Sequence, residues 1–264
     1  MEAASTCNSF NVDFDDQLCR LEREGYCILN DAIPPATVKK IVAELQALEA
    51  ACTDHGADNR GRVIKRDDTR FMIHHLQFEN CPSVHDIITD GAGTRFLEAA
   101  TGDNLICTGA SFAHCKPGFP GLPMHTDFNP YAGNPYRPNN PIVIRALYYL
   151  SDLTQERSPL RLLPYSHLTL HKNMQFNREF NETRKDEIQV VCPAGTAVLF
   201  NPRMFHGVGP NRSTESRRSM TITFRPAWAR PLHPVEEHEP AKLAALPNSL
   251  RVFFEGQNHS SAGL

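Results

Sequence analysis

Short β-type runs separated by Pro, Gly and Asn fill the chain from Asn104 onward, and they restrict the folds open to it. Helices are expected ahead of them, at 15–24, after Pro34–Pro35 along an apolar stripe, and at 93–100. Short strands with turn signals favour a mainly β jelly roll or sandwich with flanking helices over βαβ units. The expected strands are 104–114, 142–150, 159–163, 188–192, 196–200 and 218–226.

The length of 264 residues is compatible with a single domain, 1–264. We divide it into a helical part at about 13–100, a β-core at about 104–228 and a polar, Pro-rich tail at 229–264. The 27 basic and 30 acidic residues balance to a net charge of −3, which predicts neither a nucleic-acid surface nor a membrane contact. A small molecule is therefore the expected partner, and the sequence does not indicate an oligomeric state.

The eight cysteines are scattered, form no C-x-x-C pair and follow no export signal, which favours reduced thiols. No apolar stretch is long enough to span a membrane. We therefore expect a cytoplasmic protein. The chain also has no G-x-G-x-x-G or Walker-type loop, which argues against nucleotide-dependent chemistry.

A metal-binding pattern begins with His125 and Asp127, two residues apart. On an extended strand both side chains point to one face, so they can bind one ion. With 12 histidines in the chain, this tripeptide alone is weak evidence, and a polar loop is the alternative.

A third ligand candidate, His206, follows the buried strand expected at 196–200. Two His and one carboxylate on one octahedral face leave three positions open, as in non-haem Fe(II) oxygenases. Zinc usually prefers a closed or tetrahedral shell. The pattern therefore predicts an iron site at His125, Asp127 and His206.

Arg217 and Ser219 would share one face of the last core strand, with Thr221 and Thr223. A guanidinium inside a barrel needs an anion, and a carboxylate held by two parallel hydrogen bonds would satisfy it. The co-substrate 2-oxoglutarate offers such a carboxylate, while an ion pair with Asp or Glu is the alternative.

These residues make the chain resemble the phytanoyl-CoA dioxygenase family of Fe(II)/2-oxoglutarate oxygenases. The likeness covers much of the chain and includes the eleven-residue interval from His206 to Arg217. The stretches that carry it are Glu24-Gly25-Tyr26, Lys116-Pro117-Gly118, Pro159 through His167, and Gly195 through Arg217. Tyr165-Ser166 and Thr126 depart from the family's usual residues, which are Gly-Ser or Gly-Thr and Gln.

The resemblance implies a double-stranded β-helix core of the cupin-like kind, with Fe(II), 2-oxoglutarate and O₂ as cofactor and co-substrates. It implies His125, Asp127 and His206 as iron ligands and Arg217 as the anchor of 2-oxoglutarate, with Ser219 beside it. The implied reaction converts 2-oxoglutarate to succinate and hydroxylates or otherwise oxidises a small organic substrate. Related halogenases lack the carboxylate that Asp127 supplies, so halogenation is disfavoured.

Other residues are assigned by position. Thr126 and Arg70 are further candidates for contact with the co-substrate, and no catalytic side chain is expected beyond the metal ligands. The segment after the H-x-D can form a pocket wall, and its candidates for substrate contact are Phe128, Tyr131, Tyr136 and Arg137.

Several alternatives stay open. His167 and His171 have a metal-ligand spacing, but their Pro-containing approach favours a turn. The basic cluster Arg60, Arg62, Lys65, Arg66 and Arg70 could face a phosphorylated substrate or solvent. In the strand around Leu147, either the odd-numbered or the even-numbered residues face the cavity. The rival functions are a cupin-like metal-binding protein without turnover and a metal enzyme that does not use 2-oxoglutarate.

Overall fold

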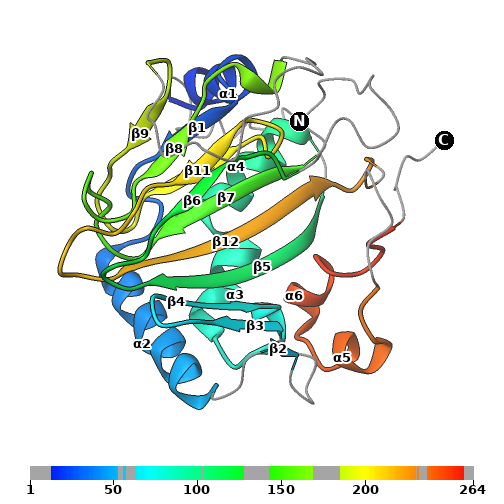
Figure 1. The fold of residues 1–264 in the computed structure, drawn as a ribbon. Coiled ribbons are helices and arrows are strands. Elements are labelled where there is room, and N and C mark those ends of the chain that lie inside the picture. The colour runs from blue at the N-terminus through cyan, green and yellow to red at the C-terminus, as the bar shows by residue number, and fades with distance from the viewer. Residues whose placement is uncertain are drawn as a thin grey trace.

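Two antiparallel β-sheets form the centre of the protein in a computed structural model, which describes residues 13–52, 56–57, 63–102, 104–127, 143–168, 185–229, 231 and 237–258 (Figure 1). The large sheet has the order β1-β10-β7-β12-β5-β4-β3-β2, and the small sheet has the order β6-β11-β8-β9. In both sheets, strands that are far apart in the sequence are hydrogen-bonded neighbours, such as β10 beside β7 and β11 beside β6. This arrangement is the double-stranded β-helix expected from the sequence. The expected fold class is thus confirmed.

The strands of the large sheet are β1 (Tyr26–Leu29), β2 (Gly56–Ala57), β3 (Val63–Arg66), β4 (Arg70–His74), β5 (Leu105–Cys115), β7 (Ile144–Tyr149), β10 (Ala197–Phe200) and β12 (Arg217–Pro226). Those of the small sheet are β6 (Leu122–His125), β8 (Leu160–Leu162), β9 (Ile188–Val190) and β11 (His206–Val208). The helices are α1 (Asp13–Arg23), α2 (Pro35–Ala51), α3 (Pro82–Asp90), α4 (Ala92–Thr101), α5 (Pro240–Ala244) and α6 (Asn248–Arg251), with 3₁₀ helices η1 (Leu76–Phe78) and η2 (Ser166–Leu168).

The helices pack on the outer face of the large sheet, where α3 and α4 lie behind β12 and β5 in Figure 1. Helix α2 starts with Pro35 at its first turn and buries the predicted stripe of Val38, Ile41, Leu45 and Leu48, with Val42 packed beside it. Alternation along β12 sends Met220 and Ile222 into this outer core. The small sheet packs against the opposite face of the large sheet.

A second apolar cluster lies on the inner face of the large sheet, where Leu147 and Tyr149 of β7 pack with residues of β8, β9 and β10. Ala146 and Tyr148 belong to the outer core. The odd-numbered set that begins with Arg145 therefore faces the interior, which resolves the choice that the sequence left open.

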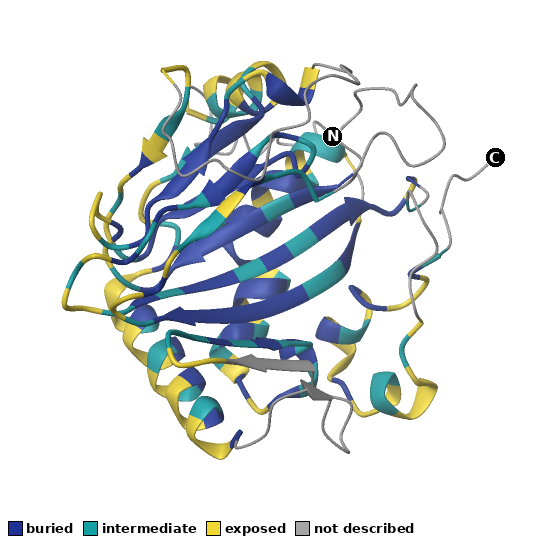
Figure 2. Ribbon diagram, viewed as in Figure 1, coloured by how far each residue is buried: buried dark blue, intermediate teal, exposed yellow. Residues whose placement is uncertain are grey.

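The segment predicted to be a polar tail contains α5 and α6, and it buries Leu250 and Phe254 in the outer core (Figure 2). Arg225, at the end of β12, is buried and donates hydrogen bonds to the carbonyls of Gly256 (3.0 Å) and Gln257 (2.9 Å). The polar composition hid this packing because only a few apolar side chains face inward. Within the described ranges, no helix is long and apolar enough to cross a membrane.

Candidate metal and co-substrate site

His125 and His206 lie directly opposite each other on β6 and β11, and their ring centroids are 4.4 Å apart. Asp127 follows β6, and its backbone N–H donates to the carbonyl of Pro202 at 3.0 Å. Its Oδ1 is 3.8 Å from Nε2 of His125, and its Oδ2 is 3.5 Å from Nε2 of His206. One ligand atom from each of the three residues lies within 4.8 Å of the other two.

The hydrogen bonds of the two imidazoles favour metal binding. Nδ1 of His125 lies 2.9 Å from the carbonyl of Pro123, and Nδ1 of His206 lies 2.9 Å from that of Met204. A carbonyl only accepts, so each Nδ1 carries a proton, and it is Nε2 that offers a lone pair to an ion when the ring is neutral. Burial lowers the pKa of His206 to about 4, although the charge of Asp127 acts in the opposite direction. His206 is therefore neutral near pH 7.

Oδ2 of Asp127 is buried and accepts no hydrogen bond within the described structure. A buried carboxylate oxygen that accepts no hydrogen bond is costly unless cations compensate it; the guanidinium of Arg145 is one such cation, and a bound metal ion would be a second. With the neutral imidazole of His206 and the Nε2 of His125 beside it, this donor set fits a divalent metal that accepts nitrogen and oxygen ligands.

Arg145, which the sequence did not single out, is the arginine that lies beside this carboxylate in the described part of the chain. Its Nε lies 2.7 Å from Oδ2 of Asp127. Neither atom forms a hydrogen bond of acceptable geometry, so the contact is electrostatic in nature. In the sequence, the alternation of residues along β7 was the feature that could have pointed to Arg145. It did not show whether the odd-numbered or the even-numbered residues face the cavity.

Arg217 lies on the inner face at the start of β12, is 3% exposed, and has no acidic partner among the described residues. Its Nη1 is 3.9 Å from Sγ of Cys115, and its Cζ is 5.2 Å from the centroid of the Tyr149 ring. Its Nε and Nη2 make no hydrogen bond to any residue that the structure describes. This buried, unpaired guanidinium disfavours the structural ion pair with Asp or Glu and fits a bound carboxylate.

Tyr149 and Ser219 complete the surroundings of Arg217. They pair across β7 and β12, and both are buried. Burial raises the pKa of Tyr149 to about 12, so the hydroxyl keeps its proton and can donate to an anion. Sequence reasoning missed Tyr149 because the inward face of β7 was undetermined.

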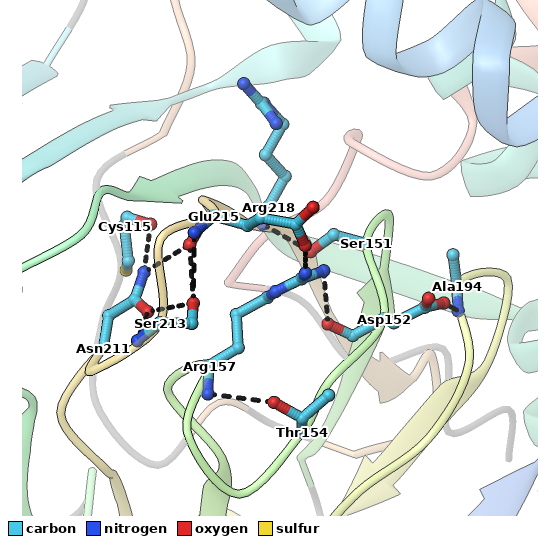
Figure 3. Close-up of polar contacts among 10 residues, drawn as sticks. All are labelled: Cys115, Ser151, Asp152, Thr154, Arg157, Ala194, Asn211, Ser213, Glu215 and Arg218. Carbon is cyan, nitrogen blue, oxygen red and sulfur yellow. Dashed lines mark hydrogen bonds and ion pairs between the residues drawn. The ribbon is translucent and has the colours of Figure 1, made fainter.

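The turn before β12 is held by the buried side chain of Asn211 (Figure 3). Nδ2 of Asn211 donates to the carbonyls of Glu215 (2.8 Å) and Cys115 (3.3 Å). Its Oδ1 accepts from the hydroxyl of Ser213 at 2.7 Å. Arg157 forms an ion pair with Glu215 on the outer side of the same turn. These contacts fix the chain between His206 and Arg217, and with it the position of the guanidinium.

Arg70 lies on β4 directly opposite Cys115, which is also the partner of Arg217 on the other side of β5. Directly opposed residues share a face, so Arg70 and Arg217 are on the same side of the sheet. The Arg70 guanidinium lies 5.8 Å from the centroid of Phe119. Thr126 is half-buried and lies between the ligand candidates His125 and Asp127, just after the end of β6.

Other candidates lie elsewhere. His167 is on η2, and its Nε2 is 3.0 Å from the carbonyl of Glu22, so the structure does not bring it to the triad. His114 pairs with Glu49 of α2 on the outer face. Residues Phe128, Tyr131, Tyr136, Arg137, His171, Arg60 and Arg62 lie outside the described residues, as do the side chains of Lys65 and Arg66.

A double-stranded β-helix that brings two histidines and a carboxylate together on one sheet, with a buried arginine on a strand of the other sheet, defines the class of non-haem iron(II)- and 2-oxoglutarate-dependent oxygenases. Residues 21–219 match the model of the family "Phytanoyl-CoA dioxygenase (PhyH)". The chain belongs to this family.

Similar proteins agree with this membership. The chain is 30% identical over 239 residues to "Dioxygenase andF" of Emericella variicolor, covering 87% of this chain and 79% of that protein. It is 25% identical over 218 residues to "Dioxygenase trt7" of Aspergillus terreus, covering 80% and 73%. The epimerase SnoN, solved with Fe³⁺, alpha-ketoglutarate and nogalamycin RO, shares the fold with a TM-score of 0.66 at 17% identity, covering 86% of this chain and 90% of that chain.

The protein is therefore an Fe(II)- and 2-oxoglutarate-dependent oxidoreductase that consumes O₂, as the sequence predicted. The expected dioxygenase activity and its cofactors are confirmed at the level of the family.

Proposed function

We propose that His125, Asp127 and His206 bind Fe(II), and that the enzyme hydroxylates or otherwise oxidises a small organic substrate while 2-oxoglutarate is converted to succinate. The observation that carries the proposal is the meeting of three ligand atoms within 4.8 Å, with both imidazoles oriented by carbonyls. The metal, once bound with 2-oxoglutarate, would supply the activation of O₂. The surrounding residues orient the ligands and restrict access.

Arg217 is proposed to bind the remote carboxylate of 2-oxoglutarate, with the hydroxyls of Tyr149 and Ser219 as further donors. Support comes from its burial and from two guanidinium nitrogens that have no hydrogen-bond partner within the described ranges. Thr126 and Arg70 remain proposed contacts of the co-substrate. Phe128, Tyr131, Tyr136 and Arg137 remain proposed substrate contacts because they follow the metal ligands in sequence.

We also propose a single domain over 1–264 and a small-molecule substrate. A cytoplasmic location is part of the proposal. It is supported by the free thiols of the seven cysteines in the described part of the chain.

The first test uses metal-free protein mixed anaerobically with Fe(II) and 2-oxoglutarate. We expect the visible charge-transfer band of the chelate and, after admission of O₂, succinate. His206→Ala should lose the band, whereas the matched control His114→Gln should keep it because His114 lies on the outer face. Absence of both band and succinate in the wild type would contradict the proposal.

Two rival functions are separated by the same assay. A cupin-like binding protein would bind metal without forming succinate. A metal enzyme that does not use 2-oxoglutarate would remain active when the co-substrate is omitted. The unpaired Arg217 argues against both, because neither needs a buried cation beside the metal site.

A further inference from the structure

Arg145 projects from β7 towards the open side of the metal site. The side chains of Arg145 and His125 are 34% and 42% exposed, compared with 14% for Asp127 and 8% for His206. Across the sheet, Arg145 is paired with Phe200, whose ring centroid lies 4.7 Å from that of His206. Arg145 therefore lies where a substrate would approach the metal.

The guanidinium of Arg145 is only partly satisfied. Within the described structure its partner is Asp127, reached through Nε alone, and this contact lacks hydrogen-bond geometry. The two terminal nitrogens have no partner among the described residues, and the side chain as a whole is 34% exposed. A metal bound by Asp127 would share the charge of that carboxylate and place a second cation near Arg145. The metal-loaded site would thus leave an uncompensated positive charge at its opening.

Position distinguishes this charge from the proposed anchor of 2-oxoglutarate. Tyr149 packs against Arg217, and Arg145 lies four residues earlier on the same strand, roughly 13 Å away along β7. Arg217 and Arg145 therefore approach the metal site from different ends of β7. The sequence after Asp127, from 128 to 142, contains Arg137 but no Asp or Glu that could neutralise Arg145.

We propose that Arg145 binds a carboxylate of the substrate, so that the enzyme acts on an organic acid and oxidises it at a carbon near the acid group. This inference rests on the proposed function. An arginine offers a planar pair of donors that matches a carboxylate, and its charge would select the acid over the neutral amide of the same shape.

The test uses the holoenzyme with Mn(II) in place of iron, saturated with 2-oxoglutarate, and two probes of equal shape, benzoate and benzamide. Paramagnetic relaxation of the probe protons reports binding close to the metal without turnover. We expect millimolar benzoate to be relaxed and benzamide much less. Arg145→Gln should weaken benzoate binding by about tenfold or more, which is the effect of losing one charged hydrogen bond.

Arg145→Lys should retain part of the preference for benzoate, and Arg212→Gln, which removes an exposed arginine, should behave as wild type. Equal relaxation by both probes, no relaxation by the wild type, or unchanged benzoate binding in Arg145→Gln would each overturn the inference. Arg145 could instead contact the carboxylate by which 2-oxoglutarate would bind the metal. The dissociation constant for 2-oxoglutarate should stay within about threefold in Arg145→Gln, and a tenfold loss would assign Arg145 to the co-substrate instead.

Binding of Mn(II) and 2-oxoglutarate is measured in the same samples. Wild-type protein that binds neither would contradict the proposed function, and the inference would fall with it. Protein that binds both but shows no acid preference would contradict the assignment of Arg145 alone.

Discussion

Asn211→Asp is the sharpest test of how the turn before β12 positions Arg217, because the substitution keeps the shape of the side chain while it replaces the donating NH₂ group with an oxygen and adds a negative charge. Nδ2 of Asn211 donates to the carbonyls of Glu215 (2.8 Å) and Cys115 (3.3 Å). A carboxylate oxygen in that place would face both carbonyls without a proton. The contact of Oδ1 with Ser213 would remain.

Two lost hydrogen bonds of about 1 kcal/mol each, together with the repulsion between buried oxygens, give a loss of about 3 kcal/mol in the free energy of unfolding. For a chain of this size, that corresponds to a fall of about 6–12 °C in Tm. The carbonyl of Cys115 belongs to the residue that contacts Arg217, so the guanidinium should shift as well. We expect the dissociation constant for 2-oxoglutarate to rise about tenfold.

Thermal unfolding measures the first effect, and titration of the Fe(II) chelate band under anaerobic conditions measures the second. Ser213→Ala is the matched control, because it removes a half-buried hydroxyl from the same turn and should cost about 1 kcal/mol or less. Asn211→Asp protein with wild-type Tm and unchanged affinity would refute the reasoning.

Three further predictions follow from the same contacts. Arg217→Gln should raise the 2-oxoglutarate concentration needed for half-maximal succinate formation by about tenfold or more while Fe(II) binding is retained, and equal loss of both would argue against the anchor. Burial lowers the pKa of His167, so as the pH falls this histidine is protonated in the unfolded chain before it is protonated in the folded protein. The free energy of unfolding should therefore decrease as the pH drops below about 6.5. In urea unfolding, His167→Gln should make this decrease with pH smaller. Gly25 has a φ of +89°, and a Cβ there would lie 2.5 Å from Nδ1 of His167, so Gly25→Ala should lower the unfolding free energy by about 2 kcal/mol or more; an unchanged Tm would be incompatible with this geometry.

Much of the β-core could be predicted because its strands follow simple local rules. The expected strands at 104–114 and 218–226 correspond to β5 and β12 within one residue at most ends. Period-two alternation and the turn residues between runs were sufficient there. β4 was missed because its charged flank, with Arg66 and Arg70 around two aspartates, resembles a solvated loop.

The site was predictable where sequence spacing determines direction, and less so where packing decides. His125 and Asp127 share a face because they are two residues apart, and Arg217 was placed by strand register. Tyr149 and Arg145 required knowledge of which side of β7 the helices cover. That choice depends on contacts such as Tyr148 against Gly93, where an added Cβ would lie 2.5 Å from the tyrosine hydroxyl. Such contacts join parts of the chain that no local pattern relates.

The C-terminal segment sets a practical limit on how this enzyme can be divided. The family match ends at residue 219, three residues into β12, yet Leu250, Phe253 and Phe254 complete the core behind that strand. A fragment trimmed to the matched region would keep every proposed ligand of the metal and 2-oxoglutarate but would interrupt the central strand of the large sheet. Proteolysis near 230 would leave Arg225 without two of its carbonyl acceptors. The smallest piece that folds and binds iron is therefore expected to extend to about Asn258, well beyond the last residue of the site.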